Sequence, residues 1–178
     1  MRIPVGEQKI LGRGRFLELV DEGGWEFVRR PHASGVVVIV ATTDDGAVVL
    51  VEQPRVPVHR RVIEVPAGLV GDHAAVAGEP LESAAARELE EETGFRAARL
   101  EVIGEGPSSV GLAAEILTFF RASGLTRVGP GGGDDSEDIT VHVVPRAEVS
   151  AFLAAKIREG GLVDPKVYAA LHFIDAEG

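Results

Sequence analysis

The stretch RELEEETGF, residues 87–95, places four glutamates in a segment that otherwise has the composition of a helix. Like charges at helical spacing repel one another, so this arrangement needs an explanation. The surrounding sequence predicts a helix over residues 80–93, because Pro80 suits a first helical turn and Gly94 suits the position after the last. Its apolar positions form one stripe that should pack on the core: Leu81, Ala85 and Leu89.

Three of the four glutamates lie on or beside this apolar stripe. At about 100° per residue, Glu88 and Glu92 fall within the stripe, Glu91 lies on its edge and Glu90 points to the opposite side. A carboxylate near a packed face needs a partner, and Arg87, which points away from the stripe, cannot serve all three. Converging carboxylates are the usual ligands of a hard divalent cation. The pattern favours a metal site, with a solvated acidic helix as the alternative.

The overall composition limits the classes of function. The chain has 178 residues, which suits one domain or a domain with a small appendage. Its net charge of −10 argues against non-specific binding to nucleic acid or to an anionic membrane. It contains no cysteine, which excludes disulfides and thiolate catalysis. The N-terminal residues have no apolar signal core and the longest apolar run, residues 36–41, is too short for a bilayer, so a cytoplasmic protein is expected.

The remaining segments predict strands interleaved with a few helices. Extended runs on both sides of residues 21–24 indicate a hairpin. Further strands are expected at residues 36–41, 47–53, 60–68 (ending at Pro66), 116–122 and 138–144, and helices at residues 145–160 and 164–174. Residues 69–80 are predicted as a loop, and a mobile acidic loop precedes residue 138. The prediction is an α+β fold, with a mixed sheet covered by helices on both faces.

The wider pattern E-x7-R-E-L-x-E-E-x-G-F, from Glu79 to Phe95, resembles the Nudix box, G-x5-E-x7-R-E-U-x-E-E-x-G-U, where U is apolar. Every position of the box from Glu79 to Phe95 matches. The leading glycine departs from the pattern, because His73 stands six residues before Glu79. Gly68 is its equivalent if the connecting loop has about five extra residues, which loops tolerate. The resemblance implies the Nudix α/β/α sandwich over residues 33–178, with a small antiparallel β element over residues 1–32.

Members of the Nudix family hydrolyse a nucleoside diphosphate linked to another moiety, with Mg²⁺ or Mn²⁺. The resemblance implies that Glu88 and Glu92 are metal ligands and that Glu91 is a ligand or a catalytic helper. Arg87 would orient a box glutamate, with Glu79 in support. Metal ions bridge pyrophosphate oxygens and lower the pKa of the attacking water, and about two or three ions are expected per site.

The segments VEQPR, VIEVPAGLV, PSSVGLAAE and EDITVHVV resemble the ADP-ribose pyrophosphatase branch over nearly the whole chain. The branch implies a homodimer that cleaves ADP-ribose to AMP and ribose 5-phosphate. It implies a metal bound by the carbonyl of Ala67 and a phosphate bound by Arg55, for which a solvated strand end is the alternative. Further substrate contacts would come from Leu69, Ser109, Gly111 and Glu115.

Val110 stands where ADP-ribose hydrolases often have a proline. The alternative substrates are therefore GDP-mannose, another nucleotide sugar, a flavin or a dinucleoside polyphosphate. An inactive Nudix-like module that binds nucleotides is the alternative that is not an enzyme, although such modules usually lose box glutamates and this chain keeps them.

The acidic segment DDSEDI, residues 134–139, resembles a catalytic loop of the branch. The resemblance implies that Glu137 is a metal ligand and Asp135 the catalytic base. Aspartate is one methylene shorter than the usual glutamate, so Glu137 is the rival candidate for the base. The glycines on its N-terminal side would allow hinge movement over substrate. The alternative is that this segment is only a solvated linker.

Trp25 is the only tryptophan, and it lies in the polar segment GWEFVRR. In the resembled branch this region reaches across the homodimer and stacks on adenine. Glu26 and Arg30 match substrate-contact positions there. A tryptophan of the ordinary core is the alternative for Trp25.

Overall fold

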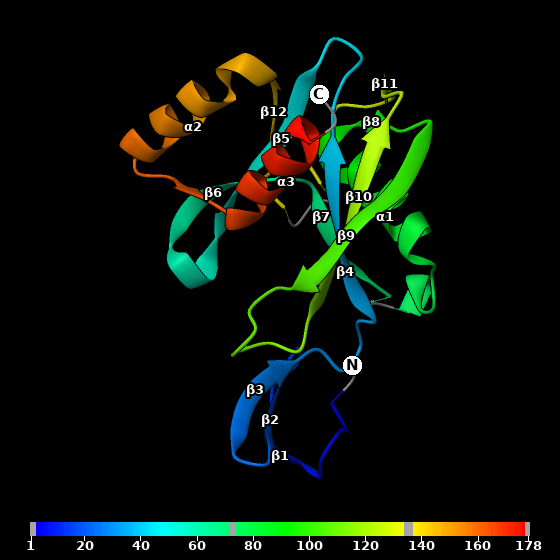
Figure 1. Cartoon of the computed structure of the whole chain (residues 1–178), viewed down its shortest axis with the longest axis vertical. Coiled ribbons are helices and arrows are strands. Elements are labelled where there is room, and N and C mark those ends of the chain that lie inside the picture. Colours follow the sequence, from blue (N-terminus) through cyan, green and yellow to red (C-terminus); the bar gives the residue numbers. More distant parts are fainter. Residues whose placement is uncertain (1–2, 72–73, 134–136, 177–178) are drawn as a thin grey trace.

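The computed structural model describes residues 3–71, 74–133 and 137–176. Three sheets carry most of the chain (Figure 1). The first has the order β1 (Gln8–Arg13), β2 (Glu18–Glu22), β3 (Trp25–Arg29). The second has the order β7 (Ala67–Val70), β4 (Gly35–Ala41), β10 (Ile116–Ser123), β9 (Arg99–Pro107). The third has the order β12 (Thr140–Pro145), β5 (Ala47–Arg55), β6 (Arg60–Glu64), β13 (Leu162–Val163).

The helices and the shorter elements lie around these sheets. The α-helices are α1 (Leu81–Thr93), α2 (Val149–Arg158) and α3 (Pro165–Asp175). Single 3-10 turns are η1 (Val56–Val58), η2 (Ala74–Val76) and η3 (Arg146–Glu148), and a two-stranded pair joins β8 (Phe95–Arg96) to β11 (Thr126–Arg127). None of the helices in the described ranges has the length and apolar character that crossing a membrane requires.

The two faces of strand β4 pack in two different hydrophobic clusters, each of which includes residues from helices. Successive side chains of a strand point to opposite faces. Val37 and Ile39 pack in one buried cluster with Leu89 of α1. Val38 packs in a second cluster with residues of α2 and α3, such as Val167. The central strand is therefore apolar on both faces, and the mixed sheet is covered on both sides as predicted (Figure 1).

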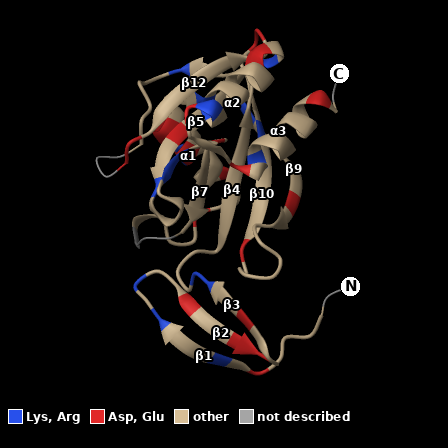
Figure 2. Cartoon of the chain, turned by 90° about the vertical axis from the view of Figure 1, so that its left-hand side faces the viewer, with Lys and Arg blue, Asp and Glu red and all other residues tan. Residues whose placement is uncertain are grey.

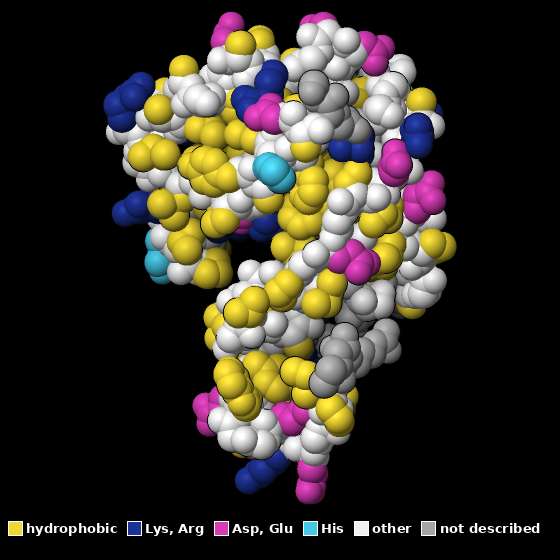
Figure 3. All heavy atoms as spheres, in the orientation of Figure 1, with side chains coloured by type: hydrophobic (Ala, Val, Ile, Leu, Met, Phe, Trp, Pro, Cys, Tyr) yellow, Lys and Arg dark blue, Asp and Glu magenta, His cyan; other side chains and the backbone are white. Residues whose placement is uncertain are grey.

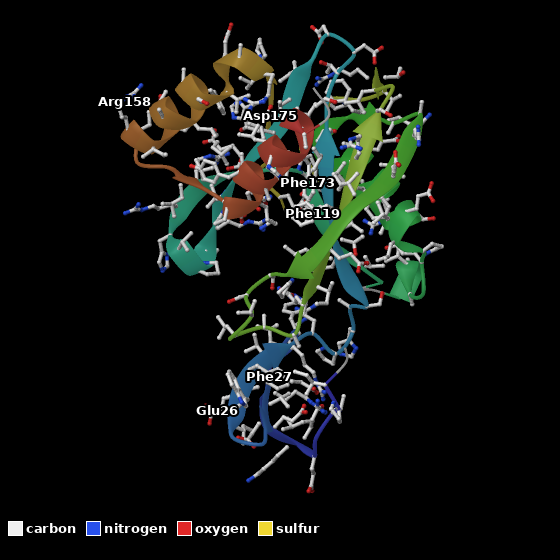
Figure 4. The ribbon with its side chains drawn as sticks, viewed as in Figure 1. Glu26, Phe27, Phe119, Arg158, Phe173 and Asp175 are labelled. Carbon is white, nitrogen blue, oxygen red and sulfur yellow. The ribbon has the colours of Figure 1, made fainter. Side chains whose placement is uncertain are left out.

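The second cluster is closed by an aromatic contact between β10 and α3. The rings of Phe119 and Phe173 lie 5.4 Å apart with a tilt of 50° (Figure 4). Gly104 of β9 leaves room for this contact, because a Cβ there would come within 2.9 Å of the Phe173 ring. This aromatic packing helps to fix the C-terminal helix against the sheet, where Arg121 of β10 also donates to the carbonyl of Phe173 at 3.4 Å.

The N-terminal sheet forms a separate layer at one end of the molecule (Figure 2). The expected hairpin is present: Gly23 and Gly24, with φ of 62° and 89°, connect β2 to β3. Strand β1 was not predicted. The layer is tied to the main domain by Val28, whose N–H donates to Leu112 O at 2.8 Å and whose carbonyl accepts from Ala114 N at 3.0 Å.

The strand predicted over residues 60–68 is wrong in its boundaries. Strand β6 ends at Glu64, and residues 67–70 form β7, which belongs to the other sheet. Pro66 has no N–H to donate to a ladder, and its carbonyl accepts from Ile39 N at 2.8 Å. The chain thus passes from one sheet to the other at Pro66. Strands β8, β9, β11 and β13 were not predicted either.

The end of α1 is a docking point for the glycine-rich segment that precedes the acidic residues. Gly94 ends the helix with φ of 72°, and Gly132 N donates to Glu92 O at 2.9 Å. Gly133 N donates to Glu91 O at 3.0 Å. A Cβ at Gly131 would collide with the backbone of Thr93. The expected hinge is therefore a close-packed contact where the structure describes it, up to residue 133.

Gly94→Ala should lower the free energy of unfolding by at least about 2 kcal/mol, because a left-handed residue would gain a Cβ that falls on the carbonyl oxygen of Gly129. Gly106→Ala is the matched control, since a Cβ at Gly106 meets nothing within 4 Å. Urea unfolding of both variants checks this, and equal losses of stability would contradict it.

Candidate active site

A cleft of about 570 Å³ opens between the two main sheets. One wall comes from the β5–β6 hairpin and from the start of α3, and the other from β7 and the connection between β9 and β10. Figure 3 shows this face hollowed beside the N-terminal part of the molecule. Ala67, Gly68 and Leu69 of β7 line the cleft, so its floor lies directly against α1.

Each of the three basic side chains that line the cleft in the described residues is paired with an acid. Arg55 donates to both oxygens of Glu64, from Nε at 2.6 Å and from Nη2 at 2.7 Å. Arg30 Nε donates to Glu115 at 2.6 Å. Lys166, on the same wall as Arg55, has its Nζ 2.6 Å from Asp164, which also caps α3. The cleft is lined with cations whose charge is already partly balanced.

The carboxylates of α1 that the helical wheel placed on the apolar stripe are indeed buried or partly buried. Glu92 is 4% exposed, and its Oε2 accepts from Ala67 N at 3.0 Å. The Glu88 carboxyl occupies the place that a Cβ on Gly68 would take. A side chain at Gly68 would push this carboxyl aside, which agrees with Gly68 as the equivalent of the leading box glycine. Helix α1 and β7 therefore meet through carboxylates.

Arg87 connects three glutamates. Its guanidinium donates to Glu79 at 2.8 Å, to Glu88 at 2.9 Å and to Glu91 at 3.0 Å. The expectation that Arg87 points away from the stripe is therefore wrong for Glu88 and Glu91, because its long side chain curls back. These contacts raise the pKa of Arg87, and the hydrogen bond that Arg87 donates to Glu79 is the largest cause. Glu92 has no such bond from Arg87.

The buried acids raise one another's pKa. Burial raises the pKa of Glu92 to about 8, and the charges of Glu88, Glu137 and Glu64 add to the effect against the hydrogen bond from Ala67. Burial also raises the pKa of Glu88, while Arg87 opposes the shift. Glu137 contributes to both shifts and lies against Gly133, so its carboxylate stands on the same side of α1. A cation among these oxygens would remove the cost of ionising them.

A divalent cation fits this donor set chemically, although the side chains are not arranged around one. Within residues 3–71, 74–133 and 137–176, no group of three histidine or carboxylate side chains is placed to hold a metal ion. Arg87 instead occupies oxygens of Glu88 and Glu91. The buried carboxylates, whose ionisation is unfavourable, are the observation that supports a metal here.

The predicted substrate contacts divide into two groups. Arg30, Arg55, Leu69 and Glu115 line the cleft. Ser109 and Gly111 lie in the exposed turn beside it, where Ser108 lines the wall and donates to Glu115 at 3.2 Å.

Trp25 and Glu26 lie on β3, away from this cleft. Trp25 is 71% exposed, which rules out the core tryptophan that was its alternative. Glu26 is on the outer side of the N-terminal sheet (Figure 4). Asp135, the predicted base, lies outside the described residues.

Sequence reasoning missed several residues of the cleft: Glu64, Asp164 and Lys166. The dipeptide Asp164-Pro165 is a typical start of a helix, and the following lysine could have been placed beside it. Nothing in the local sequence marks Glu64, because its partner Arg55 reaches it only across the β5–β6 ladder.

Comparisons with known proteins identify the relatives of this chain. A family model described as the NUDIX domain matches residues 31–166. A methanol dehydrogenase activator of Bacillus methanolicus is 31% identical over 153 residues, which are 85% of this chain and 76% of that protein. An ADP-ribose pyrophosphatase of Bacillus subtilis (strain 168) is 41% identical over 101 residues, 57% of this chain and 50% of that protein.

A second ADP-ribose pyrophosphatase, from Mycobacterium tuberculosis, is 35% identical over 143 residues, 80% of this chain and 65% of that protein. The chain thus spans less than two thirds of the length of either ADP-ribose pyrophosphatase. A crystal structure of an ADP compounds hydrolase superposes with a TM-score of 0.70 at 21% identity, covering 98% of this chain and 92% of the other. This likeness confirms the predicted fold class.

The raised pKa of Glu92 predicts how stability depends on pH in the absence of metal. A folded-state pKa of about 8 lies above the usual 4.5, so the folded form holds its proton more tightly. The free energy of unfolding should therefore fall with rising pH between about pH 5 and about pH 8, by up to ~1.4 kcal/mol per pH unit from this group. Glu92→Gln should remove this contribution. Urea unfolding in EDTA at several pH values checks it, and identical pH slopes for both proteins would refute it.

Proposed function

The chain belongs to the Nudix family, in its ADP-ribose pyrophosphatase-like branch, and on this premise we propose that it hydrolyses the pyrophosphate bond of a nucleoside diphosphate sugar. ADP-ribose is the proposed substrate, with AMP and ribose 5-phosphate as products. The observation that carries the proposal is the set of buried carboxylates on α1 at the floor of a cleft with basic groups on both walls.

The residues of α1 and β7 would hold Mg²⁺ or Mn²⁺, which neutralises the diphosphate and lowers the pKa of the attacking water when bound. Glu88, Glu92 and Glu137 are the proposed ligands with the carbonyl of Ala67, and Glu91 is a ligand or helper. About two or three ions are proposed, in keeping with two-metal chemistry at phosphate centres.

The protein's own part in the reaction is positioning and proton transfer. Arg87 fixes the carboxyl groups of Glu88 and Glu91 through its hydrogen bonds. The base takes a proton from a water molecule while the water oxygen attacks one phosphorus. The bond from that phosphorus to the bridging oxygen breaks, and the bridging oxygen leaves with the other phosphate. Asp135 is the proposed base and Glu137 its rival. Arg55 can donate from Nη1 to a phosphate oxygen while its Nε and Nη2 stay paired with Glu64.

The N-terminal element, residues 1–32, is proposed to complete the cleft of a partner subunit in a homodimer, with residues 33–178 as the hydrolase domain. Several of its large apolar side chains are exposed in the single chain: Ile10, Leu11, Phe16, Leu19 and Trp25. Trp25 is proposed to stack on adenine, because a flat aromatic that is 71% exposed suits the face of a base.

A phosphatase-coupled assay of phosphate release tests the function. It compares ADP-ribose, GDP-mannose, ADP-glucose, FAD and diadenosine polyphosphates, each with and without Mg²⁺. Metal-dependent preference for ADP-ribose is the expected result. Preference for GDP-mannose would keep the chemistry and replace the substrate, and Val110, which is 86% exposed in the turn beside the cleft, is then the position to vary. Turnover of none by the folded protein would refute hydrolysis and favour a nucleotide-binding module.

Glu92→Gln should lower kcat by at least about 100-fold, because it removes a proposed metal ligand while the amide oxygen can still accept from Ala67 N. Glu90→Gln is the matched control, since Glu90 pairs with Arg96 on the outer side of the same helix. It should keep wild-type kcat. Steady-state kinetics of the two variants, with circular dichroism for the fold, checks this, and wild-type turnover by Glu92→Gln would place the metal elsewhere.

Trp25→Ala should raise KM for ADP-ribose by about 10-fold or more with little change in kcat, because stacking on a base contributes ~1–3 kcal/mol. Phe16→Ala, a comparably exposed aromatic of the same layer, is the control for loss of apolar surface. Sedimentation measurements show whether each variant keeps the subunit number of the wild type. An unchanged KM in Trp25→Ala would contradict the stacking role.

A further inference from the structure

A cluster of charged side chains lies outside the cleft and centres on Glu52 of β5. Glu52 is 9% exposed. Its Oε1 accepts from Arg61 Nε at 2.9 Å, and its Oε2 lies 2.8 Å from Lys156 Nζ and 2.9 Å from His142 Nε2. Burial raises the pKa of Glu52, but the contacts with Lys156, His142 and Arg61 outweigh it and lower the pKa to about 2. Glu52 is therefore a fixed anion, with partners from β6, β12 and α2.

Arg61 connects this anion to the segment that carries Glu137. Its Nη1 donates to Asp138 Oδ2 at 2.7 Å, and its Nη2 reaches Asp138 O and Thr140 Oγ1, both at 3.3 Å. The same Nη2 donates to the carbonyl of Glu52 at 3.0 Å. All three nitrogens of the guanidinium are therefore used, in a fork that a lysine ammonium cannot reproduce.

The other side of the acidic segment is fixed to the helix that carries the box glutamates. Gly132 N and Gly133 N donate to the carbonyls of Glu92 and Glu91. Residues 132–133 are thus held by the last turn of α1, and Asp138 is held by Arg61. Glu137 stands directly before Asp138, and its carboxylate lies against Gly133.

From this arrangement we propose that Arg61 is a positioning residue, which through Asp138 fixes where Glu137 stands relative to Glu88 and Glu92. The proposal rests on the proposed function only in taking these three carboxylates as the metal site. Arg61 itself touches neither the cleft nor the carboxylates of α1. Arg61 would hold Glu137 in place before metal and substrate bind. Binding would then not have to bear the entropy cost of ordering Glu137.

The experiment compares Arg61→Ala, Arg61→Lys and Asp138→Asn with Arg146→Ala. Arg146 is a matched control because it makes a two-pronged bond to Asp175, at 2.9 and 2.6 Å, between η3 and α3. The exposures of the two pairs are similar, 37% and 72% for Arg61 and Asp138 against 32% and 57% for Arg146 and Asp175. A loss common to all of these variants would therefore reflect a missing ion pair in general.

Arg61→Ala is expected to lower kcat by about 10- to 100-fold, as loss of a residue that orients metal ligands typically does. KM for ADP-ribose should change by less than about 3-fold, because Arg61 does not line the cleft. Arg61→Lys should have a melting temperature close to that of the wild type, because it keeps the positive charge. It should not recover kcat, because the forked set of hydrogen bonds is lost. Asp138→Asn should lower kcat less than Arg61→Ala, and the double variant should be no worse than Arg61→Ala alone. Arg146→Ala should keep wild-type kcat.

Two further measurements do not depend on turnover. Electron paramagnetic resonance titration should show weaker Mn²⁺ binding in Arg61→Ala by about 10-fold or more, and hydrogen exchange should show faster exchange at residues 137–140 but not in α1. If the wild type turns over no substrate, the proposed function fails, and these two measurements still decide the role of Arg61. If Arg61→Ala does not fold, Asp138→Asn, which leaves the contact of Arg61 with Glu52, takes its place.

Wild-type kcat together with wild-type Mn²⁺ affinity in folded Arg61→Ala, or in Asp138→Asn if it replaces that variant, would overturn the proposal. A loss in Arg146→Ala equal to that in Arg61→Ala would also overturn it, as would full recovery of kcat by Arg61→Lys.

Discussion

The constraint on which the structure depends is the packing of carboxylates between α1 and β7. A helix usually meets a sheet through apolar side chains, as Leu89 does here, but Glu92 also reaches the N–H of Ala67 and Glu88 lies against Gly68. Burial makes the ionised form of these groups costly. The surrounding elements reduce that cost: Arg87 binds Glu88, and Gly68 gives the room. The same helix therefore packs on the core through Leu89 and presents the carboxylates of the proposed metal site beside that contact.

The sequence predicts most closely the elements whose patterns are local. Helix α1 was placed to within a residue, because its start, its glycine stop and its apolar spacing all agree. Strands β4 and β5 were found from their β-branched runs. The passage from β6 to β7 was missed because a single apolar run, interrupted at Pro66, serves two sheets. Strand β9 was missed because its half-exposed sequence alternates weakly, and its pairing with β10 is set by tertiary structure.

The candidate site shows the same division. The helical wheel alone predicts that Glu88 and Glu92 are buried, and the resemblance adds Arg30, Arg55 and Glu115, which do line the cleft. Neither the helical wheel nor the resemblance identified the partners that come from distant parts of the chain. Glu64 meets Arg55 across a ladder, and Arg61 meets Asp138 over 77 positions of sequence. The helical wheel was also wrong at Arg87, because it places only the Cα. The long side chain bends back, so that its guanidinium binds Glu88 and Glu91.

The pairing of every basic group along the described cleft wall has a consequence for selectivity. A free anion such as inorganic phosphate meets cations that already have an acid beside them, so it gains less charge compensation than it would from unpaired cations. A diphosphate with a bound divalent cation carries both negative and positive charge. The cleft walls also carry both, because each basic side chain lies beside an acid. Under the proposed function, the paired walls would suit a diphosphate already neutralised by its metal ion better than a bare anion, and this pairing would disfavour simple phosphates.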